Sequence, residues 1–235
     1  MNENFPGLIA QNVRRIRERI VRTAESCGRF PGDVILLAIS KTFPQEAIAE
    51  AMTAGIDRFG ESRVQEAETK IHHFSGAPKP EWHLIGHLQS NKARRAVELF
   101  DVIQSVDSVK LAARISLAAM ELGKKISILL QTDLGNEETK FGATPNEIRG
   151  IIEEISGFEG IRLDGLMTIP PYFENQEGAR PYFRRLRELG EKLESEKPGC
   201  LGKRHFSMGM SHDFETAIRE GATMIRVGTA IFGTR

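Results

Sequence analysis

The stretch Val34-Ile-Leu-Leu-Ala-Ile-Ser-Lys41 is an apolar run that ends in two polar residues, and Pro44 follows it closely. A short, continuous apolar run of this kind is typical of a parallel strand that is buried on both faces. Proline is favoured in the first turn of a helix. The segment therefore predicts a strand that leads directly into a helix.

Seven further apolar runs follow, and each leads into an amphipathic polar stretch. The predicted strands lie at about 57–60, 82–86, 101–106, 126–132, 161–169, 205–208 and 224–228. Eight strands that alternate with helices are the count of a (β/α)8 TIM-type barrel. We therefore predict the α/β class and this barrel, with residues 1–235 as a single domain. A doubly wound open sheet is the alternative, but it normally carries a glycine-rich first turn, and here that turn reads Ser40-Lys41-Thr42-Phe43-Pro44.

An extra helix is predicted at the N-terminus. Its apolar residues recur at three- and four-residue spacing, with arginines between them, at Phe5, Ile9, Val13, Ile16 and Ile20. Only seven residues follow Gly228, too few for a full helix after the eighth strand. Because strands one and eight are neighbours in a closed barrel, we expect the N-terminal helix to cover that gap.

Composition and charge exclude several classes of protein. The 235 residues are 40% hydrophobic and 27% charged, which is typical of a globular protein and argues against disorder. Lys and Arg together number 32, as do Asp and Glu, so the zero net charge removes the usual electrostatic case for binding nucleic acid or an anionic membrane. No apolar run approaches the roughly 20 residues that a membrane helix needs.

Cysteine content and the N-terminal residues indicate where the protein works. Cys27 and Cys200 are too few for a disulfide scaffold or a zinc site, and we interpret both as reduced thiols. The first twenty residues lack the apolar core of a secretory signal, so we expect a cytoplasmic protein. Because no amphipathic stretch is left over once the barrel is covered, we expect a monomer.

Lys41 stands at the carboxyl end of the first predicted strand. Side chains alternate along a strand, so Lys41 shares a face with Ile35, Leu37 and Ile39. If that face points into the barrel, the amine lies above an apolar interior. A neutral lysine amine in such a place can attack an aldehyde and form a Schiff base. The alternative is a lysine that merely ends a strand and extends its amine to water.

The last two strands carry candidate phosphate-binding residues. The segment 206–213 offers small residues and free backbone N–H groups ahead of a helix, and Gly228 and Thr229 follow the eighth strand. Phosphate sites in barrels often lie in the loops after strands seven and eight. As alternatives, the glycines are ordinary turn residues, and Ser211 or Asp213 is only a helix cap.

Barrel topology places these groups on one rim, because strand eight lies beside strand one. A ligand with a phosphate at one end and an aldehyde at the other would suit them, and pyridoxal 5′-phosphate is such a molecule. Arg226 alternates with Met224 and Gly228, and on the inward face it would donate to the ring nitrogen. Because arginine stays protonated, that nitrogen would stay unprotonated, which weakens the cofactor as an electron sink. The alternative is an arginine in a salt bridge at the end of the strand.

Six stretches in order along the chain carry a family resemblance: Leu36-Leu-Ala-Ile-Ser-Lys-Thr42, Phe59-Gly-Glu-Ser-Arg-Val-Gln-Glu66, Trp82-His-Leu-Ile-Gly-His-Leu-Gln-Ser-Asn-Lys92, Gly165-Leu-Met-Thr-Ile-Pro-Pro171, Ser207-Met-Gly-Met-Ser211 with Asp213-Phe214, and Arg226-Val-Gly-Thr229 with Ile231-Phe-Gly233. Through them, residues from about 7 to 233 resemble the pyridoxal-phosphate homeostasis protein family. That family has the fold of the N-terminal barrel of alanine racemases.

The resemblance implies a Schiff base between pyridoxal phosphate and Lys41. It also implies phosphate contacts from Ser207, Gly228 and Thr229, and a place for Arg226 near the pyridine ring. Two positions depart from the family pattern. Ser62 stands where the family usually has Asn, and Gln104 stands where it usually has His. We therefore expect no amide contact from position 62 and no histidine role at position 104.

The resemblance further implies a protein that buffers or delivers pyridoxal phosphate, with pyridoxal-phosphate-dependent apoenzymes as acceptors, rather than an enzyme. The first alternative is a weak amino-acid racemase. Alanine racemases use a tyrosine from a second domain as their second base, and this sequence has only Tyr172 and Tyr182, of which Tyr172 lies closer to the rim. The second alternative is a barrel aldolase that uses Lys41 without a cofactor.

Overall fold

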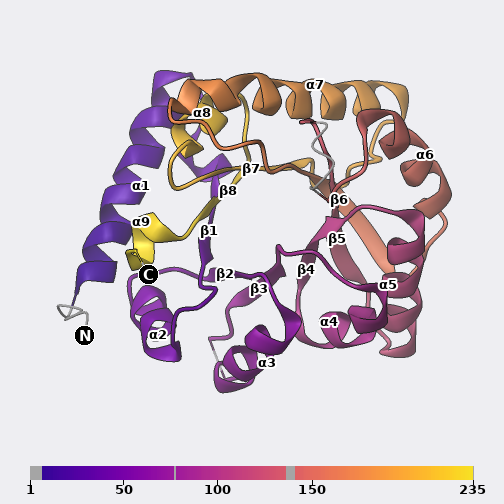
Figure 1. The fold of residues 1–235 in the computed structure, drawn as a ribbon, viewed down its shortest axis with the longest axis horizontal. Coiled ribbons are helices and arrows are strands. Elements are labelled where there is room, and N and C mark those ends of the chain that lie inside the picture. Colours follow the sequence, from indigo (N-terminus) through magenta and orange to yellow (C-terminus); the bar gives the residue numbers. More distant parts are fainter. Residues whose placement is uncertain (1–6, 77, 136–140, 235) are drawn as a thin grey trace.

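Eight parallel strands close into a barrel in the computed structural model, which describes residues 7–76, 78–135 and 141–234. The strands follow one another around the barrel in sequence order, and β1 (Ile35–Ile39) pairs with both β2 (Arg58–Glu61) and β8 (Met224–Val227). In Figure 1 the strands lie toward the centre and the helices surround them. The predicted TIM-type barrel is confirmed, and the open doubly wound sheet is wrong because the sheet has no free edge.

Each strand from β1 to β7 is followed by a helix that returns the chain to the opposite end of the barrel, whereas β8 is followed only by a helix of four residues. The remaining elements are α1 (Leu8–Ser26), η1 (Pro31–Asp33), α2 (Gln45–Thr53), α3 (Val64–His73), β3 (Glu81–Leu84), η2 (Ser90–Lys92), α4 (Ala93–Leu99), β4 (Val102–Val106), α5 (Val109–Glu121), β5 (Ile126–Gln131), α6 (Pro145–Ile155), β6 (Ile161–Met167), η3 (Gln176–Ala179), α7 (Arg180–Glu196), β7 (His205–Met210), α8 (Phe214–Arg219) and α9 (Thr229–Phe232). All eight predicted strands are present, within a few residues of the predicted limits.

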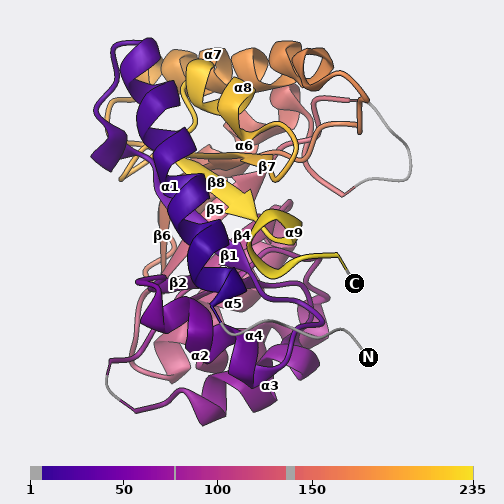
Figure 2. The same cartoon turned by 90° about the vertical axis from the view of Figure 1, so that its left-hand side faces the viewer.

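The N-terminal helix α1 takes the place of the missing eighth helix. It contacts α2, α8 and α9, and Figure 2 shows it crossing in front of β1 and β8. Its buried face contains Ile9, Val13, Ile16 and Ile20, as the spacing predicts, while Phe5 lies outside the described residues. The short α9 is all that follows β8 in the described chain.

The buried apolar residues form two separate clusters, one outside the barrel wall and one inside it. Most buried apolar residues belong to one cluster between the strands and the surrounding helices. The apolar cluster inside the barrel is small, with Leu37, Ile39 and Met224 packed against Ile35 and Ile85. Buried polar side chains from β3, β4, β7 and β8 are joined to one another by hydrogen bonds, so the barrel also encloses a polar network.

Strand register brings the end of β1 and the end of β8 together. Leu37 pairs with Arg226, and Ala38 pairs with Val227. The chain leaves both strands within a few residues of these pairs, so Lys41 and Gly228 lie on the same rim of the barrel. Within the part of the chain that the structure describes, no helix is both long and apolar enough to cross a membrane.

Candidate functional site

Lys41 lies in a tight turn between β1 and α2. The backbone N–H of Phe43 donates to the carbonyl of Ser40 at 3.0 Å, which closes a four-residue turn with Lys41 and Thr42 at its centre. The side chain of Lys41 is half-buried. Ile35, Leu37 and Ile39 share one face, as predicted, and it is the face toward the barrel interior. The strand ends at Ile39, so the turn and not strand alternation sets the direction of Lys41.

Arg226 is the cation at the centre of the barrel interior. It is 3% exposed, and it donates to the hydroxyl of Ser207 at 2.7 Å and to the carbonyl of Thr168 at 2.8 Å. Burial lowers the pKa of Arg226 to about 10, which still leaves the guanidinium charged at neutral pH. Among the described residues it forms no ion pair with a carboxylate, so the sequence alternative of a salt-bridged arginine is wrong.

A chain of hydrogen bonds crosses the barrel below Arg226. The hydroxyl of Ser207 donates to Oε1 of Gln104 at 2.6 Å, and Nε2 of Gln104 lies 2.8 Å from Nδ1 of His83. Nε2 of His83 lies 2.7 Å from the carboxylate of Glu81, the first residue of β3. Because arginine only donates, each group in this chain donates to the next, and the proton of His83 is assigned to Nε2.

The side chain of Gln104 therefore takes part in the site. It is fully buried, and its amide offers one acceptor to Ser207 and one donor to His83. A glutamine can serve both neighbours at once only in this orientation. Position 104 was expected only to lack the family's histidine role, and this network was not predicted. Its only signal in the sequence was the polar pair Gln104 and Ser105 within the run of the fourth predicted strand.

Two of the three candidate phosphate-binding residues, Gly228 and Thr229, lie together with Ser211 where β7 and β8 end. The hydroxyl of Ser211 accepts from the backbone N–H of Gly228 at 3.2 Å and from that of Ala230 at 3.3 Å. Thr229 lies between them at the start of α9. Hydroxyls and backbone N–H groups are the kinds of donor that bind phosphate in proteins, and here the N–H groups of Gly228 and Ala230 donate to Ser211.

Ser207 and Ser211 differ in depth. Ser207 has no exposed surface, and its hydroxyl is engaged by Arg226 and Gln104 inside the barrel. Ser211 instead lies at the rim beside Gly228. The structure thus places Ser207 in the hydrogen-bond chain and Ser211 with Gly228 and Thr229. The sequence analysis named Ser211 only as a helix cap.

Asp213 stabilises the backbone where β7 ends at this rim. Its carboxylate accepts the backbone N–H of Met210 at 2.6 Å, and the side chain is almost fully buried. Burial raises the pKa of Asp213, against the opposing effects of the Met210 bond and of the charge on Arg226. Asp213 therefore holds the end of β7 and contributes a charge near Arg226, without a direct contact between the two.

Tyr172, the candidate for a second catalytic base, lies exposed on the surface. It is 76% exposed, and its ring packs against that of His212 with 5.6 Å between centroids. Ser62, the other position that departs from the family pattern, is half-buried after β2. Neither forms a hydrogen bond with Lys41 or Arg226 among the described residues.

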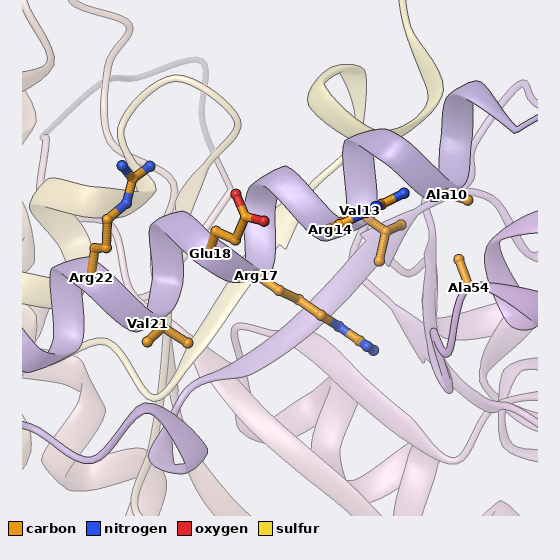
Figure 3. Close-up of a pocket in the computed structure, with 8 residues that line it drawn as sticks. All are labelled: Ala10, Val13, Arg14, Arg17, Glu18, Val21, Arg22 and Ala54. Carbon is orange, nitrogen blue, oxygen red and sulfur yellow. The ribbon is translucent and has the colours of Figure 1, made fainter.

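Two hollows lie near or outside this rim. A cavity of about 220 Å³ opens beside Ile85, with Thr132, Asp133 and Phe141 in its wall. A groove of about 700 Å³ runs along α1 toward Ala54, and Figure 3 shows Arg17 and Val21 on one side of that helix and Glu18 and Arg22 on the other. None of the candidate site residues lines this groove, so it is separate from the site.

Comparison with known proteins gives the chain its relatives. Residues 8–235 match the family described as alanine racemase, N-terminal domain. The pyridoxal phosphate homeostasis protein of Aquifex aeolicus (strain VF5) is 42% identical over 225 residues, 96% of this chain and 97% of its own. The protein of the same name from Escherichia coli (strain K12) is 39% identical over 229 residues, 97% of each chain.

Solved structures agree with these relatives. PipY of Synechococcus elongatus PCC7942 with pyridoxal phosphate bound superposes with a TM-score of 0.84 at 39% identity, covering 96% of this chain and 100% of PipY. The alanine racemase of Clostridium difficile 630 in complex with cycloserine shares the fold at 19% identity and a TM-score of 0.68. This chain covers 60% of the racemase.

Proposed function

This chain belongs to the pyridoxal phosphate homeostasis proteins of the alanine racemase N-terminal domain family, and on that premise we propose that it binds pyridoxal 5′-phosphate and buffers or delivers it in the cytoplasm. One observation carries the proposal: the register of β1 and β8 brings the Lys41 turn and Gly228 to the same rim of the barrel, and Arg226 lies buried two residues before Gly228. We propose that residues 1–235 act as one unit, as a monomer.

The donor set of the rim fits this cofactor. Arg226 is a buried cation with no carboxylate partner among the described residues, and such a group favours a ligand that brings an acceptor or a negative charge. Gly228 also fits, because a Cβ there would lie 3.3 Å from the carbonyl oxygen of Ile39. A side chain at this position would crowd that carbonyl, whereas glycine leaves the backbone accessible to a ligand.

Pyridoxal 5′-phosphate supplies an aldehyde that an amine can hold covalently, a ring nitrogen and a phosphate. The amine would come from Lys41, and the guanidinium of Arg226 would face the ring nitrogen. Gly228 and Thr229 would bind the phosphate, with the hydroxyl of Ser211 beside them. Ser207 would act through Arg226, whose orientation it fixes.

Buffering and delivery are supported by what surrounds the rim. Two-base racemisation needs a second acid or base held against the substrate in a closed site. The candidate for that role, Tyr172, is exposed and packs on His212. Thr42, next to Lys41, is exposed as well. Exposed residues beside Lys41 suit a ligand that is taken up and passed to apoenzymes.

The test is a transfer measurement. The purified protein, loaded with pyridoxal phosphate and freed of excess, is mixed with an apoenzyme that requires this cofactor, and the activity of the acceptor is followed with time. We expect the acceptor to be activated, and the loaded protein to show no exchange of the alanine Cα hydrogen with deuterium. A protein that takes up no cofactor, or one that rapidly exchanges that hydrogen, would contradict the proposal.

A further inference from the structure

Both neighbours of Lys41 are held by side chains from other elements. The hydroxyl of Ser40 donates to Oε1 of Glu61 at 2.7 Å, and the carbonyl of Ser40 accepts from Nζ of Lys70 at 2.9 Å. On the other side of Lys41, the backbone N–H of Thr42 donates to the carboxylate of Glu66. The turn is therefore attached to β2 and α3 at three points, one residue before and one residue after Lys41.

The three attaching side chains form one cluster, which we call the Glu61–Glu66–Lys70 clamp. Nζ of Lys70 lies 2.8 Å from Oε1 of Glu61 and 2.9 Å from Oε1 of Glu66. Glu66 and Lys70 lie four residues apart on α3, the spacing that brings two side chains together on one face of a helix. Lys70 thus joins the end of β2, the start of α3 and the Lys41 turn.

Two of the three side chains in the clamp, those of Glu61 and Lys70, are buried, whereas most ion pairs in proteins lie at the surface. Lys70 is 7% exposed and Glu61 has no exposed surface, and burial raises the pKa of Glu61. Oε2 of Glu61 has no hydrogen-bond partner among the described residues. Since buried ion pairs are weak contributors to stability and are retained in some proteins for the geometry that they impose, a positional role fits this cluster better than a stabilising one.

The backbone of the turn is also strained. Thr42 has a φ of 67°, a left-handed conformation at the third position of the turn, where glycine is normally found. A β-branched residue in this region is rare and persists only where the surroundings determine the backbone. The bond from Thr42 to Glu66 is the contact that holds this residue in place.

We propose that Glu61, Glu66 and Lys70 are positioning residues that fix the Lys41 turn, so that the amine of Lys41 is held where the cofactor aldehyde arrives. This inference rests on the proposed function, since it assigns the clamp a role toward the same ligand. None of the three residues touches the group of Ser211, Gly228 and Thr229, so they act on the amine and not on the phosphate-binding residues.

The decisive variant is Glu66→Ala. Glu66 is only half-buried and lies on a helix, where alanine is well tolerated. Glu66→Gln is the conservative variant, because the amide oxygen can still accept from Thr42 and Lys70. Glu68→Ala is the matched control, since it removes a carboxylate two residues away that pairs with Arg95 instead.

Three quantities are measured on the full chain. The first, without cofactor, is the hydrogen exchange rate of the Thr42 amide. The second is the rate at which added pyridoxal phosphate becomes trapped on Lys41 by borohydride. The third is the affinity for inorganic phosphate.

In Glu66→Ala we expect the Thr42 amide to lose its protection, and trapping to slow by on the order of 10- to 100-fold, as for a misplaced reacting group. Phosphate affinity should stay within twofold. Glu66→Gln should restore most of the trapping rate, and Glu68→Ala should match the wild type.

The outcomes separate the two hypotheses. If the wild type forms no adduct on Lys41, the proposed function fails. If the wild type forms it and Glu66→Ala traps at the same rate, or keeps its Thr42 amide protected, only the clamp is refuted. Lys70→Met provides a second variant, in which all three bonds of the ammonium are lost, and we expect trapping to slow at least as much as in Glu66→Ala. Wild-type trapping in Lys70→Met would also refute the clamp.

Discussion

The hydroxyl of Ser211 lies 3.2 Å from the backbone nitrogen of Gly228, although the two residues follow different strands. The same hydroxyl accepts from Ala230, so Ser211 joins the end of β7 to the start of α9. This contact marks the end of the site at the barrel rim. The hydrogen bonds that run from Arg226 to Glu81 mark how far the site extends into the barrel.

Ser211→Ala is expected to weaken the binding of inorganic phosphate about tenfold, the effect of losing one hydrogen bond to a charged group. Isothermal titration of phosphate into the protein measures this. Ser207→Ala serves as the comparison, because its hydroxyl is engaged by Arg226 and Gln104 deeper in the barrel. A larger loss in Ser207→Ala than in Ser211→Ala would return the phosphate contact to Ser207.

Gln104→Leu is expected to lower the free energy of unfolding by about 1–3 kcal/mol, because the buried Nδ1 of His83 and the hydroxyl of Ser207 lose their partner. Urea denaturation measures the change. Gln11→Leu, on an exposed position of α1, is the control and should stay within about 0.5 kcal/mol of the wild type. Equal stability of the two variants would show that the interior chain of hydrogen bonds is not stabilising.

Thr42→Gly is expected to be more stable than Thr42→Ala by about 0.5–1 kcal/mol. A Cβ in the left-handed region costs about 1–2 kcal/mol, and the extra freedom of glycine in the unfolded chain offsets part of this difference. Thermal or urea unfolding of the two variants compares them at the same position. An alanine variant as stable as the glycine variant would mean that the turn is not strained at Thr42.

Glu81 should make unfolding depend on pH in acid. The hydrogen bond from His83 lowers the pKa of Glu81 to about 2, against burial. A carboxylate with a lowered pKa stabilises the folded state at neutral pH, and this contribution is lost as the pH falls from about 4.5 toward 2. Glu81→Gln should therefore take up fewer protons on unfolding in this range, by up to one. An identical pH slope in the variant and the wild type would contradict this pKa.

The sequence analysis was most successful for the barrel itself. Apolar runs located all eight strands, and the spacing of Ile9, Val13, Ile16 and Ile20 located the helix that closes the gap. These features repeat along the chain and depend only on local periodicity. Alternation along the strand also predicted that Ile35, Leu37 and Ile39 share a face, but it left open whether that face points into the barrel.

The distance of a side chain from the barrel rim was not predictable in the same way. Ser207 and Ser211 are four residues apart, roughly 13 Å along an extended strand, and which of them reaches the rim depends on where the strand ends. β7 is also irregular between Ser207 and Met210, with a left-handed Gly209 between them. The sequence analysis therefore identified the segment and named the deeper of the two hydroxyls.

The clamp was beyond sequence reasoning for a different reason. The second predicted strand ended at residue 60, whereas Glu61 is the last residue of β2 and its carboxylate accepts from Ser40. Lys70 reaches it from α3 across nine residues. Contacts between side chains from three elements depend on how those elements pack, and no local period encodes that packing.

The central claim is that Lys41 holds pyridoxal phosphate at this rim, and the most direct measurement is an absorption spectrum of the loaded protein before and after borohydride, with the modified peptide mapped by mass spectrometry. We predict a band near the edge of the visible range that disappears on reduction, with the added mass on Lys41 and neither the band nor the adduct in Lys41→Ala. A wild-type protein that stays colourless with added pyridoxal phosphate, or an adduct that maps to another lysine, would contradict the account.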